Sequence, residues 1–145
     1  MELYTYDARI KATPEQIFEV VNDDDRLKEW SPIFAGNIYY TEDKRTKGTK
    51  FRTMMKVLNK TYQFRSIITE YEENRFIEVE TTLKQGIITS SFRLKPEGKD
   101  ETRVQVTSRF DAESKRYALV LKGIRPVVRR VLDNQMKKLE TITAH

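Results

Sequence analysis

Cysteine is absent from this chain of 145 residues, and histidine occurs once, at His145, the last position. Without cysteine there is no disulfide scaffold, no thiol nucleophile and no thiolate metal site. A single terminal histidine also argues against a histidine triad, a multi-histidine metal site or a histidine general base inside the fold. We therefore expect neither a metal nor a cofactor.

Long apolar runs are missing as well. No stretch approaches the roughly 20 residues of a membrane-spanning helix. The N-terminus has no basic region followed by an apolar segment, so we expect no signal peptide and a cytoplasmic location. With 38% hydrophobic and 34% charged residues, the composition is that of a folded soluble protein. The length predicts a single domain over residues 1–145. We expect a monomer or weak homodimer.

Charge is unevenly distributed along the chain. Lys and Arg number 27 against 22 Asp and Glu, a net charge of +5. Residues 1–72 carry 12 of each sign, whereas residues 73–145 carry 15 basic and 10 acidic groups. Such an excess fits nucleic acid or an anionic membrane, and equally the solvated face of a helix. Even spacing and a lack of interleaved aromatic residues favour the solvated face, so we expect no specific nucleic-acid partner.

Two short helices are expected near the N-terminus. Thr13, followed by Pro14 and by Gln16 three residues on, has the pattern of a capping box. The acidic run 23–25 is predicted to end this helix and to cap a second one, about Asp24 to Glu29. The same acidic run could bind a cation weakly, but the sequence offers no further ligand residues beside it.

The rest of the chain has the pattern of strands followed by one helix. Alternating apolar and polar residues with short turns predict an antiparallel meander. Apolar residues at spacings of three to four then predict a long helix, in which Gly123 and Pro126 predict either a bend or a hinge. The expected strands are Leu3–Ala12, Phe51–Leu58, Tyr62–Tyr71, Phe76–Lys84, Ile87–Lys95 and Arg103–Phe110, and the expected helix is Ala112–Thr143.

Four segments resemble the START-like, or SRPBCC, superfamily. Ile10 to Phe18 resembles its opening, and Asp25 to Pro32 its "D…EW.P" stretch. Gly48 to Phe51 resembles its "G-T-x-F" strand, and Thr69 to Arg75 its "T-E-Y-x-P-x-R" corner, with Glu73 where proline is common. The bacterial polyketide cyclase/dehydrase-like branch is the most similar one.

This resemblance implies an α+β helix-grip fold: a curved antiparallel sheet of six to seven strands around the long C-terminal helix. It also implies an elongated apolar cavity between the sheet and that helix. Members bind lipids, sterols, polyketides or aromatic metabolites, and some are cyclases or aromatases. Fold alone therefore does not fix the activity.

Ligand-binding candidates are the inward positions of the predicted strands and helix. Most of these side chains can equally serve only to pack the core. Hydroxyl groups on otherwise apolar faces favour a ligand, because a few polar groups in an apolar hollow are typical of small-molecule sites. The candidates are Phe51, Thr53, Met55, Phe64, Ser66, Ile68, Val79, Thr81, Ser90, Phe92, Tyr117, Val120, Leu121 and Ile124.

Catalytic candidates are few. Glu70 continues the inward alternation of Ser66 and Ile68, and Tyr117 lies near the start of the long helix. Because no acid–base pair is apparent, we expect binding or carriage of a small hydrophobic or aromatic molecule, such as a lipid or a polyketide-like compound. The alternatives are a cyclase or aromatase acting in the same cavity, and an interaction protein that uses its basic surface.

Overall fold

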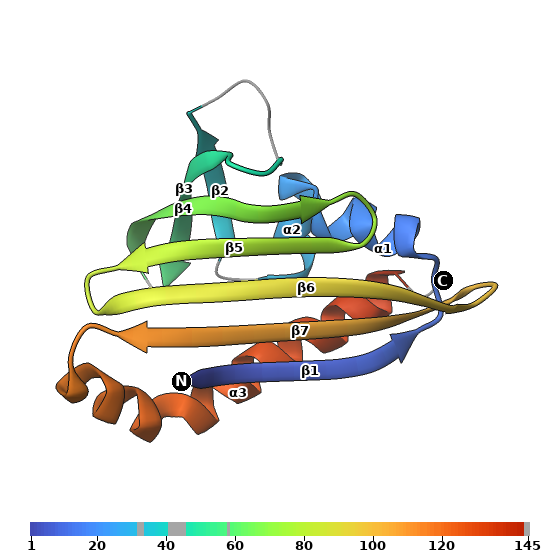
Figure 1. Cartoon of the computed structure of the whole chain (residues 1–145). Helices are drawn as coiled ribbons and strands as arrows, with labels where there is room; N and C mark the ends of the chain where they lie inside the picture. The colour runs from blue at the N-terminus through green and yellow to red at the C-terminus, as the bar shows by residue number, and fades with distance from the viewer. Residues whose placement is uncertain (32–33, 41–45, 58, 144–145) are drawn as a thin grey trace.

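The computed structural model describes residues 1–31, 34–40, 46–57 and 59–143, with only the backbone of Val57 (Figure 1). Pro32, Leu58 and His145 of the sequence predictions lie outside the described residues. In chain order the elements are β1 (Glu2–Ile10), α1 (Pro14–Val21), α2 (Asp24–Trp30), β2 (Phe34–Tyr39), β3 (Lys50–Val57), β4 (Lys60–Glu72), β5 (Phe76–Leu83), β6 (Gly86–Gly98), β7 (Glu101–Ala112) and α3 (Lys115–Thr143).

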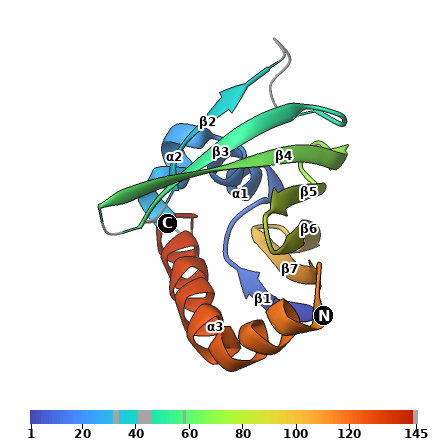
Figure 2. The same ribbon diagram turned by 90° about the vertical axis from the view of Figure 1, so that its left-hand side faces the viewer.

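Seven strands form one antiparallel sheet in the order β1-β7-β6-β5-β4-β3-β2. Strands β2 to β7 follow one another as a meander, and β1 joins at the β7 edge. The turn into β6 requires a glycine, because Gly86 has φ +153° and a Cβ there would lie 2.3 Å from the Asp111 carbonyl oxygen. Figure 2 shows the curved sheet with α3 on its concave side, which confirms the predicted helix-grip architecture.

Both short helices begin as their sequences predict. The Thr13 side chain accepts from the Gln16 backbone N–H, and the Gln16 side chain accepts from the Thr13 backbone N–H, which completes the capping box. The Asp23 carboxylate caps α2 by accepting from the backbone N–H groups of Asp25 and Arg26. The acidic run therefore has a structural role at this helix start.

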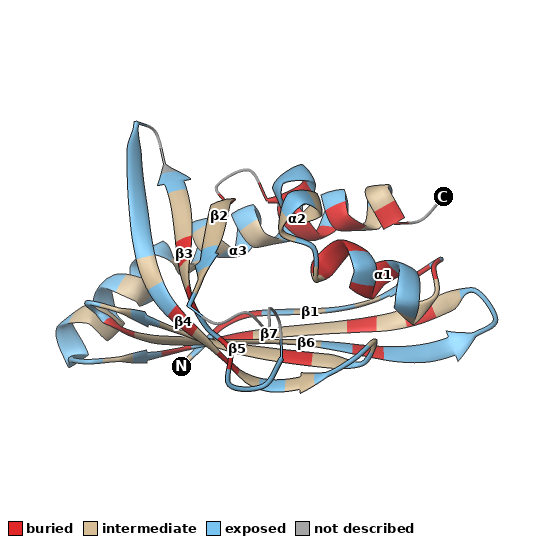
Figure 3. Ribbon diagram, turned by 90° about the horizontal axis from the view of Figure 1, so that it is seen from above, coloured by how far each residue is buried: buried red, intermediate tan, exposed pale blue. Residues whose placement is uncertain are grey.

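Helix α3 is a continuous helix with two different environments. Pro126 lies inside it, and Figure 2 shows the helix changing direction along its length. Its buried residues all come from its C-terminal part, namely Gln135, Met136, Leu139 and Thr143 (Figure 3). No helix in the described part of the chain is long and apolar enough to cross a membrane.

The core lies where the three helices meet the concave face of the sheet. Ile17 of α1, Ile68 of β4, Val104 of β7 and Leu139 of α3 are all completely buried in one cluster. The N-terminal part of α3 has no buried residue, so we expect it to be held to the molecule less firmly than the C-terminal part. An apolar hollow lies beside the C-terminal part of the helix.

Candidate functional site

An apolar hollow of about 280 Å³ lies between the sheet and the helices. The strands β5, β6 and β7 form one wall, and α2 with the C-terminal part of α3 forms the other. Its lining residues are Tyr4, Val21, Leu27, Trp30, Ile77, Val79, Ser90, Ser91, Phe92, Val106, Ser108, Leu132, Gln135 and Met136.

Strand register creates the sheet wall of this hollow. Val79 on β5 pairs with Ser90 on β6, and Ser90 pairs in turn with Ser108 on β7. One step along, Ile77 pairs with Phe92 and Phe92 with Val106. Directly opposed residues share a face of the sheet, so two rows of side chains run across three strands. The hollow is therefore apolar with a band of hydroxyl groups.

Two larger depressions are unlike this hollow. One of about 640 Å³ lies beside Arg9, Lys11 and Glu97, and one of about 420 Å³ lies beside Asp23 and Lys28. Both are bordered by charged side chains, which water solvates well. A site for a small apolar molecule is expected where the lining is mainly apolar with a few polar groups. The smaller hollow is therefore the candidate site.

Polar groups in the hollow differ in how well they are paired. The Ser90 and Ser108 hydroxyl oxygens lie 3.0 Å apart and share a hydrogen bond. The Trp30 indole Nε1 is buried without a hydrogen-bond partner among the described residues. Gln135 is also buried, at 9% exposure. The residues that line the hollow therefore include a paired set of hydroxyl groups and a tryptophan whose indole nitrogen is buried and unpaired among the described residues.

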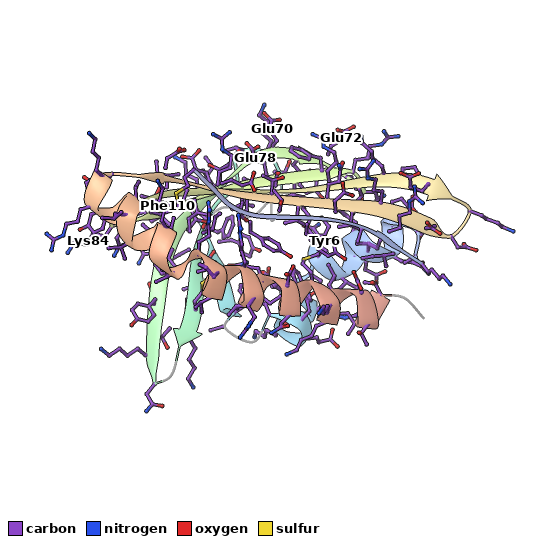
Figure 4. All side chains as sticks on the ribbon, turned by 90° about the horizontal axis from the view of Figure 1, so that it is seen from below. Tyr6, Glu70, Glu72, Glu78, Lys84 and Phe110 are labelled. Carbon is purple, nitrogen blue, oxygen red and sulfur yellow. The ribbon has the colours of Figure 1, made fainter. Side chains whose placement is uncertain are left out.

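Tyrosine hydroxyl groups fasten α3 to β1. Tyr4 Oη donates to Asp133 Oδ1 at 2.5 Å, and the Tyr6 hydroxyl donates to the Glu140 carboxylate. Figure 4 shows Tyr6 in the space between the sheet and α3. Burial raises the pKa of both hydroxyls above their ordinary value, and the hydrogen-bonded carboxylates raise it further. Both tyrosines therefore stay protonated near neutral pH.

These two contacts predict a loss of stability at alkaline pH. Because the tyrosine pKa is higher in the folded chain, their contribution is complete below about pH 10 and is lost as pH rises through the folded-state pKa. The double variant Tyr4→Phe/Tyr6→Phe is expected to show a shallower fall in melting temperature between pH 9 and pH 12. Thermal unfolding followed by circular dichroism measures it. An equally steep fall in both proteins would contradict this assignment.

Three of the predicted ligand-binding residues line the hollow, namely Val79, Ser90 and Phe92. Phe51 and Ile68 lie on the same concave side but are packed in the core. Their predicted contact with a ligand stays a prediction.

The predicted hydroxyl groups of β3 to β5 bond to one another. Ser66 Oγ lies 3.4 Å from Thr53 Oγ1 and 2.9 Å from Thr81 Oγ1. These groups are satisfied within the sheet, so they need no ligand. Met55 and Phe64, further along the same strands, are half-buried.

The predicted helix residues all come from the N-terminal part of α3. Tyr117 and Leu121 are half-buried, whereas Val120 is 58% and Ile124 is 48% exposed. None of them lines the hollow, which α3 borders with Leu132, Gln135 and Met136. The helical spacing of apolar residues identified the apolar face of α3, but it did not show which part of that face is buried.

Glu70 lies on the outer face of the sheet, and its predicted inward register is wrong. A bulge between Ile68 and Glu70 shifts the pairing, so that Glu70 opposes the outward Glu78 (Figure 4). Its carboxylate forms an exposed ion pair with Lys47, at 3.5 Å. The carboxylate therefore faces away from the hollow.

Several lining residues were not among the sequence candidates. Val106 and Ser108 belong to the clean alternation of β7, and that pattern could have identified them. Tyr4 could have been found in the same way on β1. Leu27 and Met136 gave no signal, because helix packing brings them to the hollow.

A family model described as "Polyketide cyclase / dehydrase and lipid transport" matches residues 1–142. Among curated protein sequences none is similar enough to count as a match. Solved structures show the same fold at low sequence identity. A START superfamily protein from Mycobacterium smegmatis is 19% identical with a TM-score of 0.70, covering 96% of this chain and 94% of that one.

Two further structures extend this similarity. Protein TTHA0849 from Thermus thermophilus is 16% identical with a TM-score of 0.71, covering 95% of this chain and 94% of that one. The di-domain ARO/CYC StfQ of the steffimycin biosynthetic pathway is 10% identical with a TM-score of 0.72, covering 97% of this chain. The match covers 44% of StfQ. At these identities the similarity establishes the fold alone.

Proposed function

Since the chain belongs to the polyketide cyclase / dehydrase and lipid transport family, we propose that it binds and carries a small, mainly apolar molecule in the hollow. The observation that carries this proposal is the lining: apolar side chains from strands and helices surround a few hydroxyl, amide and indole groups. Moving an apolar ligand from water into such a hollow is favourable by about 25 cal/mol for each Å² of apolar surface that is buried.

Binding without catalysis is supported by the chemistry of the lining. Among the described residues that line the hollow there is no Asp, Glu, Lys, Arg or His. A cyclase needs a group that moves a proton and a group that polarises a carbonyl. Tyr4 is the titratable group in the lining, and its raised pKa makes it a poor proton donor near neutral pH.

Native mass spectrometry of the freshly purified protein tests the proposal. The expected result is a fraction of the protein carrying a small neutral molecule, which solvent extraction then releases for identification. The extracted molecule, added back to stripped protein, is expected to bind and to be recovered unchanged. Recovery of a cyclised or dehydrated product, lost in the variant Tyr4→Phe, would instead establish the cyclase alternative.

A further inference from the structure

The N-terminal part of α3, residues 115–131, exposes a row of apolar side chains. Four of them are spaced four, three and four residues apart and so share one face of the helix: Val120, Ile124, Val127 and Val131. Their exposed fractions range from 41% at Val131 to 66% at Val127. This apolar row is therefore largely uncovered in the single chain, where aliphatic side chains gain nothing from contact with water.

The same part of the helix is strongly basic. Between Glu113 and Asp133 the sequence contains six basic residues and no acidic one. Five of the six are exposed, and the half-buried Arg125 donates to the Glu2 carbonyl oxygen at 3.3 Å. No ion pair within the described part of the chain involves any of the six. They are Lys115, Arg116, Lys122, Arg125, Arg129 and Arg130.

Two of these arginines border the apolar row. Arg116 lies four residues before Val120, and Arg130 lies three residues after Val127. Residues three or four apart are neighbours on a helix surface, so both guanidinium groups lie beside the row. Long basic side chains can keep their charge in a polar layer while their stems cover apolar surface. The apolar row and its basic border therefore form one amphipathic surface.

A neighbouring turn adds another cation at this end of the molecule. Figure 1 shows the start of α3 at the end where β5 turns into β6. The Glu113 backbone N–H donates to the Gln85 carbonyl oxygen at 2.9 Å, which holds this turn beside the start of the helix. Lys84, in the same turn, is exposed (Figure 4). The positive charge therefore comes from segments far apart in the sequence.

An anionic lipid surface fits both features. Apolar side chains of an amphipathic helix enter the boundary between headgroups and acyl chains, and basic side chains attract anionic headgroups. A second copy of this chain fits poorly, because it would bring two basic helices together. Nucleic acid fits poorly as well, because valine and isoleucine offer no ring on which a base can stack.

We propose that the N-terminal part of α3 docks the protein on an anionic lipid surface. The apolar row lies in the headgroup boundary, and the basic side chains lie against the headgroups. This inference goes beyond the proposed function, because α3 borders the hollow with later residues, Leu132, Gln135 and Met136, and docking needs no molecule in the hollow.

Co-sedimentation with lipid vesicles tests the docking. The protein is expected to sediment with vesicles of phosphatidylglycerol and phosphatidylcholine in equal parts, and to stay in solution with vesicles of phosphatidylcholine alone. Raising sodium chloride from about 50 mM to about 500 mM is expected to release it, because salt screens exposed charges. Absence of binding to the anionic vesicles at low salt, or equal binding to both kinds of vesicle, overturns the proposal.

The double variant Val120→Ala/Val127→Ala tests the apolar row. It removes four carbon atoms from exposed positions, and alanine favours the helix, so the fold is expected to persist. Binding to the anionic vesicles is expected to weaken by about 10- to 100-fold. Ile38→Ala is the matched control: Ile38 is 46% exposed on β2, away from α3, and the change is expected to leave binding unaltered. Equal losses in both proteins overturn the proposal.

A pair of charge variants separates position from net charge. Arg116→Gln/Arg130→Gln is expected to weaken binding by about 10- to 30-fold, since each basic residue near an anionic surface contributes about 5-fold. Arg9→Gln/Arg65→Gln removes the same charge from exposed positions on the sheet and is expected to cost about 2-fold or less. If both pairs lose binding equally, net charge alone attracts the protein and the docking face is wrong.

A measurement on the unaltered protein locates the docking face without any variant. Nanodiscs that contain phosphatidylglycerol and a gadolinium-labelled lipid broaden the amide signals of the residues nearest the lipid. The strongest broadening is expected at residues 115–131, and strongest broadening elsewhere overturns the assignment. A dimer in analytical ultracentrifugation that Val120→Ala/Val127→Ala dissociates would give this face to a second copy instead. None of these outcomes bears on the proposed function, which native mass spectrometry tests separately.

Discussion

Replacing Ser90 by tryptophan is expected to abolish binding of the small apolar molecule that co-purifies with the protein. Ser90 lies in the middle of the sheet wall, between Val79 on one side and Ser108 on the other. An indole ring at this position projects into the 280 Å³ hollow and occupies the volume that the ligand needs. Isothermal titration measures the loss, and circular dichroism checks that the variant keeps its fold.

Thr89→Trp is the matched control for this variant. Thr89 is the preceding residue of β6 and pairs with Glu80 and Arg109, so its side chain lies on the outer face of the sheet. The same ring placed there is expected to leave binding unchanged. Normal binding in a folded Ser90→Trp protein would show that ligands enter elsewhere.

Shortening Leu139 to alanine is expected to lower the free energy of unfolding by about 3 kcal/mol, because a buried leucine loses its packing and leaves a cavity. Leu139 is completely buried in the cluster where α3 meets α1 and the sheet. Urea denaturation followed by circular dichroism measures the change.

Leu119→Ala, in the same helix, serves as the comparison for this loss. Leu119 is 72% exposed, so the change is expected to stay within about 0.5 kcal/mol. Equal losses at both positions would mean that the N-terminal part of α3 is held as firmly as the C-terminal part. The difference in burial along α3 would then not account for the position of the hollow near residues 132–136.

Local sequence patterns predicted most of the fold. Thr13, Pro14 and Gln16 identify the start of α1, because a capping box depends only on residues a few positions apart. The alternation in β7 was equally clear, because every second residue faces the core. The long helix begins at Lys115 and not at Ala112, because β7 continues pairing with β6 as far as Ala112.

The candidate site was predicted only in part, for two physical reasons. One extra residue in β4, between Ile68 and Glu70, reverses the faces of all later residues of that strand, and alternation alone does not locate such a bulge. The stripe of α3 runs its whole length, but only tertiary packing decides that Gln135 is covered while Ile124 stays 48% exposed.

Family membership and the lining of the hollow answer different questions. The family covers both ligand-binding and cyclase-type proteins, so it does not choose between them. Our proposal of binding rests instead on the lining, in which apolar side chains surround a few hydroxyl, amide and indole groups.

The position of a bound molecule tests this account most directly. Nuclear Overhauser contacts between protons of the bound molecule and methyl groups of the protein identify the residues that surround it. We expect contacts to Val79, Val106 and Met136, which line the hollow. Contacts to Val120 and Ile124 alone, on the exposed N-terminal part of α3, would contradict the account.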